Sequence, residues 1–147
     1  MTPRWINEWA FSLRDTGRKV PGFPCWRRRT EYEYTTDEYS PATFQCAPDV
    51  FVRPDRHGYT DMGSVPELLQ LMVPKDLHLP SFILHDSACR EGGLYYASNY
   101  LGPYKFRGVS SREAARLLGL SLSASGYPMR GPMVRAAVWL FGPHFRA

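Results

Sequence analysis

The chain has 147 residues, a formal net charge of +4, 44% apolar residues and 22% charged residues. This length fits one domain with a core of its own, and the composition is that of an ordinary globular protein. No apolar run approaches the roughly 18 residues of a membrane-spanning helix, and the polar first residues predict no signal peptide.

The first half of the chain is predicted to hold a helical arm and a small β region. Apolar residues spaced by three and four predict a short amphipathic helix over residues 3–14. Glycine, proline and arginine then predict a connector to about residue 29. Alternating tyrosine and threonine predict a strand over residues 29–36, and residues 42–53 predict two short strands broken at Pro48.

The second half is predicted to be helical. Serine residues at the expected starts predict a short helix from Ser64 and a second helix over residues 81–91. A tyrosine-rich loop follows. A capping box of Ser110 and Glu113 predicts a third helix, and apolar periodicity predicts a last helix over residues 132–142.

These elements predict an α+β fold class, with a small antiparallel β region followed by three to four helices and preceded by an N-terminal helical arm. The expected domain division places the arm and connector in residues 1–40. A single α+β domain then occupies residues 41–147.

The stretch FILHDSACR, residues 82–90, places His85 and Asp86 side by side within a predicted helix. In a catalytic interpretation, His85 is a general base, and Asp86 orients it or ligates a hard cation such as calcium. A second interpretation pairs His85 with Cys89, one turn later, as soft ligands for zinc. In a third, His85 is an interior histidine and Asp86 forms an ion pair with Arg90.

The stretch YTDMGSVPE, residues 59–67, is the second candidate. Asp61 would bring a carboxylate to the His85 site, where Asp61 and Asp86 would hold a metal ion. Alternatively, Asp61 caps a turn and the serine that follows opens a helix. No cofactor is certain, and calcium and zinc are the metals that these residue types would hold.

The first thirty residues also predict a binding arm. Arg27, Arg28 and Arg29 form a basic cluster, and Trp5 and Trp9 add aromatic surface. Such an arm binds an acidic partner or nucleic acid, or it is a solvated face. The chain has no recognisable nucleic-acid-reading module, which argues against nucleic acid as the partner.

The three cysteines lie far apart in the sequence, at Cys25, Cys46 and Cys89. They form no CxxC pair, which argues against a zinc ribbon or a redox motif. Their odd number argues against a closed disulfide framework. We therefore expect reduced thiols, as in a cytosolic setting.

Four short motifs follow one another in the chain: YTDMGSVP, FILHDSACR, SSREAARLL and VRAAVWLFG. In this order they resemble a family of phage and prophage proteins, domain-of-unknown-function family 1353, over about residues 44–143. The family pattern is roughly T-D-x-A-S-[IV]-P, A-x-x-H-D-x-x-Y, E-A-D-R and a closing A-V-x-x-x-G helix. The matching positions are Thr60, Asp61, Ser64, Pro66, His85, Asp86, Arg90, Glu113, Ala114 and Arg116.

Two departures from the family pattern bear on activity. Cys89 stands at the family's tyrosine, and Ala115 stands at its helix aspartate. The family arrangement is similar to phospholipases of the A2 type, in which a histidine activates water, the adjacent aspartate holds calcium and a later aspartate orients the histidine. Loss of such an orienting aspartate can cost on the order of 10⁴ in rate. The resemblance therefore implies a degenerate His-Asp site.

Three functions remain open at this stage. The first is a virion-associated structural or interaction protein of a phage, a tail, neck or baseplate component whose partners are other virion proteins. The second is a metal-assisted hydrolase of the envelope, acting on lipid or peptidoglycan through His85 and Asp86. The third is an intracellular binder of a host protein or nucleic acid. The expected location is the virion or the host cytoplasm.

Overall fold

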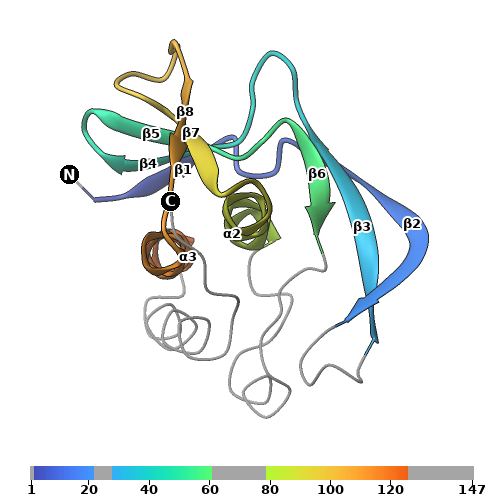
Figure 1. The fold of residues 1–147 in the computed structure, drawn as a ribbon. Coiled ribbons are helices and arrows are strands. Elements are labelled where there is room, and N and C mark those ends of the chain that lie inside the picture. The colour runs from blue at the N-terminus through green and yellow to red at the C-terminus, as the bar shows by residue number, and fades with distance from the viewer. Residues whose placement is uncertain (1, 22–27, 61–78, 126–147) are drawn as a thin grey trace.

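The computed structural model describes residues 2–21, 28–60 and 79–125. Strands of two antiparallel sheets are the main regular structure of this part of the chain, and two helices accompany them (Figure 1). The predicted fold class is therefore wrong, since the β region is the larger part and the described helices number two rather than three or four.

The larger sheet has five strands in the order β1-β4-β5-β7-β8, and each neighbouring pair is antiparallel. The two short strands predicted on either side of Pro48 are confirmed as β4 and β5, and because only Pro48 and Asp49 separate them, they form a tight hairpin. The strands are β1 (Arg4–Ile6), β4 (Thr43–Ala47), β5 (Val50–Arg53), β7 (Gly93–Ala97) and β8 (Lys105–Gly108).

The smaller sheet has three strands in the order β2-β3-β6. They are β2 (Phe11–Pro21), β3 (Arg28–Thr36) and β6 (His57–Thr60). The register places Arg14 opposite Glu33, and Glu33 opposite Tyr59. Since side chains alternate along a strand, Glu33 points away from the face where Tyr34 is buried.

The helices are α2 (Leu79–Glu91) and α3 (Ser111–Ala124). Figure 1 shows α2 between the two sheets, and α2 contacts β6 of one sheet and β7 of the other. Helix α3 packs against α2 and β1. The predicted start of α3 and its Ser110 cap are confirmed, since the Ser110 hydroxyl accepts a hydrogen bond of 3.1 Å from the Glu113 backbone N–H, whereas the Glu113 carboxylate bonds Arg116.

The core lies where these helices meet the larger sheet. Burying the apolar side chains of α2, α3, β4, β5 and β7 together is the main favourable term of such a fold. The buried cluster consists of Phe44, Val52, Leu84, Ala88, Leu94, Val109, Ala114 and Leu117.

The predicted N-terminal helical arm is wrong. Residues 4–6 form β1, residues 7–10 turn with Asn7 at a positive φ of 52°, and β2 begins at Phe11. Trp5, one of the apolar residues that predict the helix, instead packs into the core. Its ring centroid lies 5.3 Å from that of Phe44. Trp5 Nε1 also donates a hydrogen bond of 3.1 Å to the Ser121 carbonyl. Long-range pairing thus outweighs a local helical pattern.

The predicted connector and the tyrosine-rich loop are also largely strands. Residues 15–21 continue β2, and the loop expected between the helices forms the β7–β8 hairpin. The strand predicted at residues 29–36 is confirmed as β3, and the helix predicted at 81–91 is confirmed as α2. The helices predicted from Ser64 and over residues 132–142 lie outside the described residues.

Glu33 on the smaller sheet is expected to have a pKa below the ordinary value of a glutamate. Its pKa is lowered chiefly by a hydrogen bond from His57, and next by one from Arg14. The His57 Nε2 and Arg14 Nη2 atoms each lie 3.0 Å from a carboxylate oxygen. Because this pKa is below its unfolded value, the contribution to stability is present above the unfolded pKa and is lost as pH falls through the folded one.

The measurement is a carbon-detected NMR titration of the Glu33 carboxyl group, repeated in His57→Ala. The midpoint should move upward in the variant. A midpoint unchanged by this substitution would show that the His57 contact does not persist in solution.

Candidate functional site

Helix α2 carries an unusual number of buried polar side chains. Ser81, His85 and Ser87 are all buried along it, next to apolar core residues. Buried polar groups need hydrogen-bond partners and so fix neighbouring segments in place. The predicted His-Asp pair lies on this helix, which contacts β6.

His85 lies against Cys89 on one face of α2. The Cys89 sulfur is 3.3 Å from His85 Nδ1 and 3.8 Å from Nε2. Residues four apart on a helix are neighbours, so this contact follows from the sequence spacing. The His85 side chain is buried, with 9% of its surface exposed. This geometry fits both an interior histidine and the paired His-Cys interpretation.

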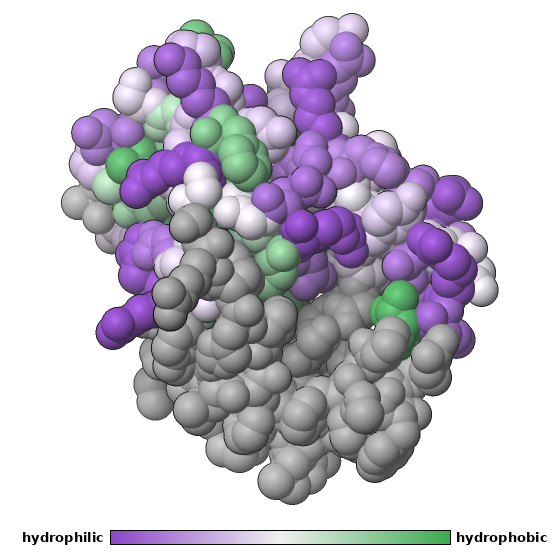
Figure 2. All heavy atoms as spheres, viewed as in Figure 1, coloured by the Kyte–Doolittle hydropathy of each residue, from purple (hydrophilic) through white to green (hydrophobic). Residues whose placement is uncertain are grey.

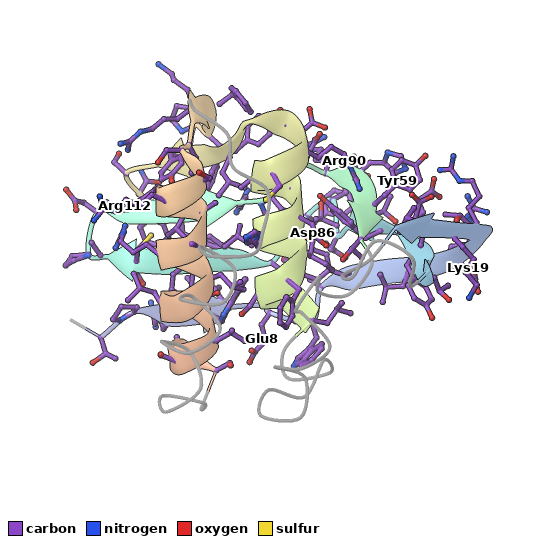
Figure 3. All side chains as sticks on the ribbon, turned by 60° about the horizontal axis from the view of Figure 1, so that its bottom comes forward. Glu8, Lys19, Tyr59, Asp86, Arg90 and Arg112 are labelled. Carbon is purple, nitrogen blue, oxygen red and sulfur yellow. The ribbon has the colours of Figure 1, made fainter. Side chains whose placement is uncertain are left out.

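Asp86 lies on the neighbouring face and contacts β6. Its Oδ2 accepts a hydrogen bond of 2.5 Å from the hydroxyl of Thr60, the buried last residue of β6. Figure 3 shows Asp86 and Arg90 on the side of α2 toward Tyr59, and the Arg90 guanidinium lies 5.1 Å from the Tyr59 ring centroid. The first two sequence motifs therefore meet in space through Thr60 and Asp86.

Tyr34 of β3 lies beneath this contact. Its side chain is 1% exposed, and burial raises the pKa of the phenol well above its usual value. Among the described residues its buried hydroxyl has no hydrogen-bond partner of good geometry, although the Ser87 side chain lies close enough to offset part of the pKa rise. A Cβ atom added at Gly58 would lie 2.9 Å from that hydroxyl, so glycine leaves the room that the Tyr34 ring occupies. Tyr34 therefore stays neutral and cannot serve as a base.

The remaining predicted site residues are only partly described. Asp61 and Arg27 lie outside the described residues, and Arg28 and Arg29 belong to β3 by their backbone alone. Among the described residues, no group of three or more histidine, cysteine, aspartate or glutamate side chains is placed to hold a metal ion.

The two tryptophans of the predicted binding arm differ in their surroundings. Trp5 packs into the core beside Phe44 and is part-buried, so it is a structural residue. Trp9 follows the turn after β1 and is 65% exposed. The structure thus leaves Trp9, and not Trp5, at the surface.

The third motif lies on α3, at a distance from β6 in the fold. Glu113 accepts hydrogen bonds of 2.8 and 2.5 Å from Arg116, an ion pair at the helix surface. Ala115, at the family's aspartate position, is buried with 2% exposed. The structure gives the Glu113 carboxylate an ion-pairing role with Arg116, while its backbone N–H is capped by Ser110.

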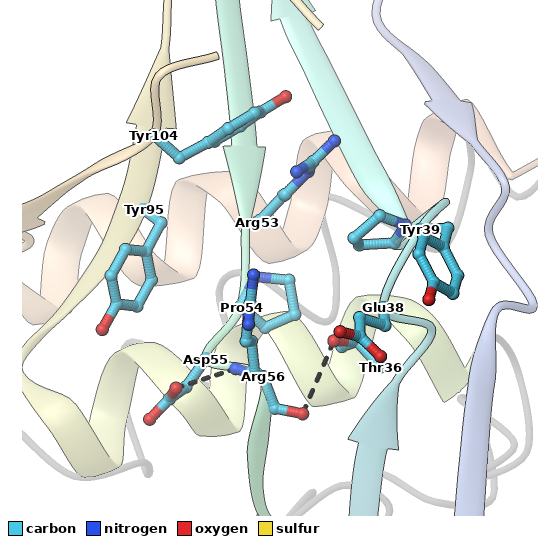
Figure 4. A pocket seen from close by; sticks show the side chains of 10 residues that line it. Thr36, Glu38, Tyr39, Arg53, Pro54, Asp55, Arg56, Tyr95 and Tyr104 are labelled. Carbon is cyan, nitrogen blue, oxygen red and sulfur yellow. Dashed lines mark hydrogen bonds between the residues drawn. The ribbon is translucent and has the colours of Figure 1, made fainter. Parts of the chain in front are cut away.

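Sequence reasoning missed a cleft where the chain crosses between the two sheets. It lies between the end of β5, the β3–β4 connection and the β7–β8 hairpin, with a volume of about 450 Å³ (Figure 4). Arginine, acidic residues and tyrosine line it together. The runs VFVRPDR and NYLGPYKF carry several of these side chains, but only the sheet order brings the two runs together.

Comparison with known protein families, with curated proteins and with solved structures found no match to the chain. The resemblance of its motifs to family 1353 therefore stays a prediction. In the part of the chain that the structure describes, no helix is long and apolar enough to cross a membrane.

Proposed function

We propose that the chain is a virion-associated interaction protein of a phage, which binds another protein of the particle through its aromatic surface. This surface consists of Tyr39, Tyr95, Tyr104 and Phe106, around the cleft. Tyr39 is 90% exposed and Phe106 is 51% exposed. Aromatic residues and arginine are enriched where proteins bind each other, and this exposure is the observation that carries the proposal.

The surroundings of the aromatic surface support the same function. The Phe106 ring packs edge-on against Tyr95 at 5.5 Å, so these rings are held in place before a partner arrives. Leu101, at the tip of the same hairpin, is 90% exposed. In Figure 2, hydrophobic residues gather around the larger sheet and its hairpin, whereas the described residues over the smaller sheet are largely hydrophilic.

The phage context rests on the order of the four motifs. If the resemblance holds, the partners are other virion proteins, in the tail, neck or baseplate. The burial of His85 and the buried alanine at position 115 support a structural use of the His-Asp pair in this chain. The proposal is therefore binding without catalysis.

The test is peptide mass spectrometry of gradient-purified virions from the phage that encodes the chain. We expect its peptides in the particle, and their absence would contradict the proposal. A particle assembled with Tyr39→Ala and Phe106→Ala together should contain much less of the chain. Arg112→Ala is the control, because Arg112 is exposed on α3 and belongs neither to the aromatic surface nor to the lining of the cleft (Figure 3).

A second candidate function is a metal-assisted hydrolase of the envelope, acting on lipid or peptidoglycan. The observation that favours it is the Thr60–Asp86 hydrogen bond, because Thr60 directly precedes Asp61 in the chain. In this candidate, Asp86 and Asp61 would hold the cation and His85 would act as the base.

Melting curves with calcium, with zinc and with a chelator separate the two functions. A metal that binds only the folded state must raise the melting temperature. Under the interaction proposal we expect no metal-dependent rise. A rise of several degrees that is lost in both His85→Ala and Asp86→Ala would favour the hydrolase. Glu91→Ala is the control, since Glu91 is an exposed carboxylate on the same helix.

A further inference from the structure

Arg53 is held rigidly at the cleft by its neighbours. Its Nε donates a hydrogen bond of 2.8 Å to the Thr43 hydroxyl, and its Nη2 donates one of 3.2 Å to the Tyr100 carbonyl. The guanidinium carbon lies 3.8 Å from the centroid of the Tyr104 ring. These contacts already order the Arg53 side chain. Binding a ligand therefore costs little further conformational entropy at this residue.

The charge of Arg53 is not neutralised by a carboxylate of the described residues. Elsewhere in that part of the chain, ion pairs join Arg14 and His57 to Glu33, Arg18 to Glu31, and Arg116 to Glu113. Arginine has five N–H donors, and the bonds to Thr43 and Tyr100 leave most of them for a ligand.

Acidic residues line another part of the same cleft. Glu38 is exposed, and Asp55 is partly buried with its Oδ1 accepting a 2.7 Å hydrogen bond from the Arg56 backbone N–H. Figure 4 shows Arg53 beside Tyr104, with Glu38 and Asp55 farther along the cleft. Because Arg56 also lines the cleft beside Asp55, a ligand meets positive charge at the Arg53 end and charges of both signs farther along.

This arrangement selects the chemistry of the ligand. A planar guanidinium fits a carboxylate through two parallel hydrogen bonds. A phosphate carries more negative charge and can also bind a guanidinium, but it has no N–H donors for Glu38 and Asp55, which line the cleft together with Arg56. A peptide carries N–H donors for those two carboxylates, and its side chains can pack on the exposed ring of Tyr39.

We infer that the cleft binds a carboxylate of a peptide segment of the partner, with Arg53 as the residue that receives it. The inference rests on the proposed function and adds the chemistry by which the partner is recognised. The carboxylate belongs to an acidic side chain or to the C-terminus of the segment, and both sources present the same group to Arg53.

The test is an NMR titration of the full chain, following the Arg53 Nε–H signal. The probes are a blocked dipeptide of tyrosine and glutamate, its glutamine counterpart, a dipeptide of tyrosine and glycine with a free C-terminal carboxylate, and inorganic phosphate. We expect a shift with at least one carboxylate probe and none with the neutral one. The stronger of the two carboxylate probes identifies the source of the group.

Three results would overturn the inference: equal binding of the neutral dipeptide, tighter binding of phosphate, or no shift at tens of millimolar probe, on the order of the weakest affinities that matter. Tighter binding of N-acetylmuramic acid, a carboxylate on a sugar, would also overturn the peptide as the occupant.

Two variants with opposite expected effects keep the test independent of folding defects. Arg53→Lys keeps the charge but removes the planar donor pair, so we expect about tenfold weaker binding. Asp55→Asn removes a negative charge and keeps the oxygen that receives the Arg56 N–H, so we expect about threefold tighter binding. If Arg53→Lys lowers the melting temperature strongly, the test rests on Asp55→Asn. An unchanged affinity of Asp55→Asn for the carboxylate probe would then contradict the inference.

The inference and the proposed function fail in different ways. Absence of the chain from virions would contradict the proposed function while leaving the peptide titration measurable. Presence in virions with no binding of any carboxylate probe would contradict the inference alone.

Discussion

Replacing Phe44 by alanine is expected to lower the free energy of unfolding by about 3–5 kcal/mol, the range for a fully buried phenylalanine. Phe44 is 0% exposed, at the centre of the core between the larger sheet and the helices. Its ring also contacts Trp5, so the substitution leaves a cavity and loosens the edge strand β1. Urea denaturation followed by tryptophan fluorescence measures the effect.

The matched control is Phe106→Ala, the same chemical change at a half-exposed position of β8. Its expected cost is about 1 kcal/mol or less, because little apolar burial is lost. This variant should fold and yet contribute to lost partner binding. Similar losses of stability for the two variants would contradict the placement of the core.

The sequence predicts best the elements whose signals are local. Ser110 marks the start of α3 correctly, because one side chain and one backbone N–H three residues later make the cap. The strand at residues 29–36 and the two short strands broken at Pro48 are likewise confirmed. Each of these signals lies within a few residues.

The sequence fails where distant segments decide the structure. Residues 4–6 become a strand because they pair with β4, almost forty residues later in register. The tyrosine-rich stretch becomes β7 and β8 because β7 pairs with β5. No local pattern carries these pairings, which depend on tertiary packing.

The contacts of the candidate sites likewise divide into local ones, which the sequence predicts, and long-range ones, which it does not. The His85–Cys89 contact follows from helical spacing alone. The Thr60–Asp86 hydrogen bond requires β6 to lie against α2, which only the fold shows. The cleft at Arg53 was missed because Tyr39, Tyr95 and Tyr104 reach it from three separate segments.

Replacing Gly93 by alanine is expected to destabilise the hairpin that carries the aromatic surface. A Cβ atom there would lie 2.3 Å from the Arg107 carbonyl oxygen and 2.7 Å from the Phe106 ring. The first of these atoms is backbone of the paired strand, so it cannot move aside without separating β8 from β7. We expect a loss of about 3 kcal/mol in the free energy of unfolding, the upper part of the range for overpacking.

Gly92→Ala separates this clash from simple backbone strain. Gly92 has a φ of +72°, but a Cβ atom there meets no other atom within 4 Å. Its expected cost is about 1 kcal/mol, from the left-handed conformation alone. Chemical denaturation of both variants gives the comparison. Gly93→Ala should also reduce virion association, because Tyr95 and Phe106 face each other across the same pair of strands. Equal free energies of unfolding for the two variants would mean that β8 does not approach β7 as closely as the structure has it. The positions of Tyr95 and Phe106 in the aromatic surface would then be wrong.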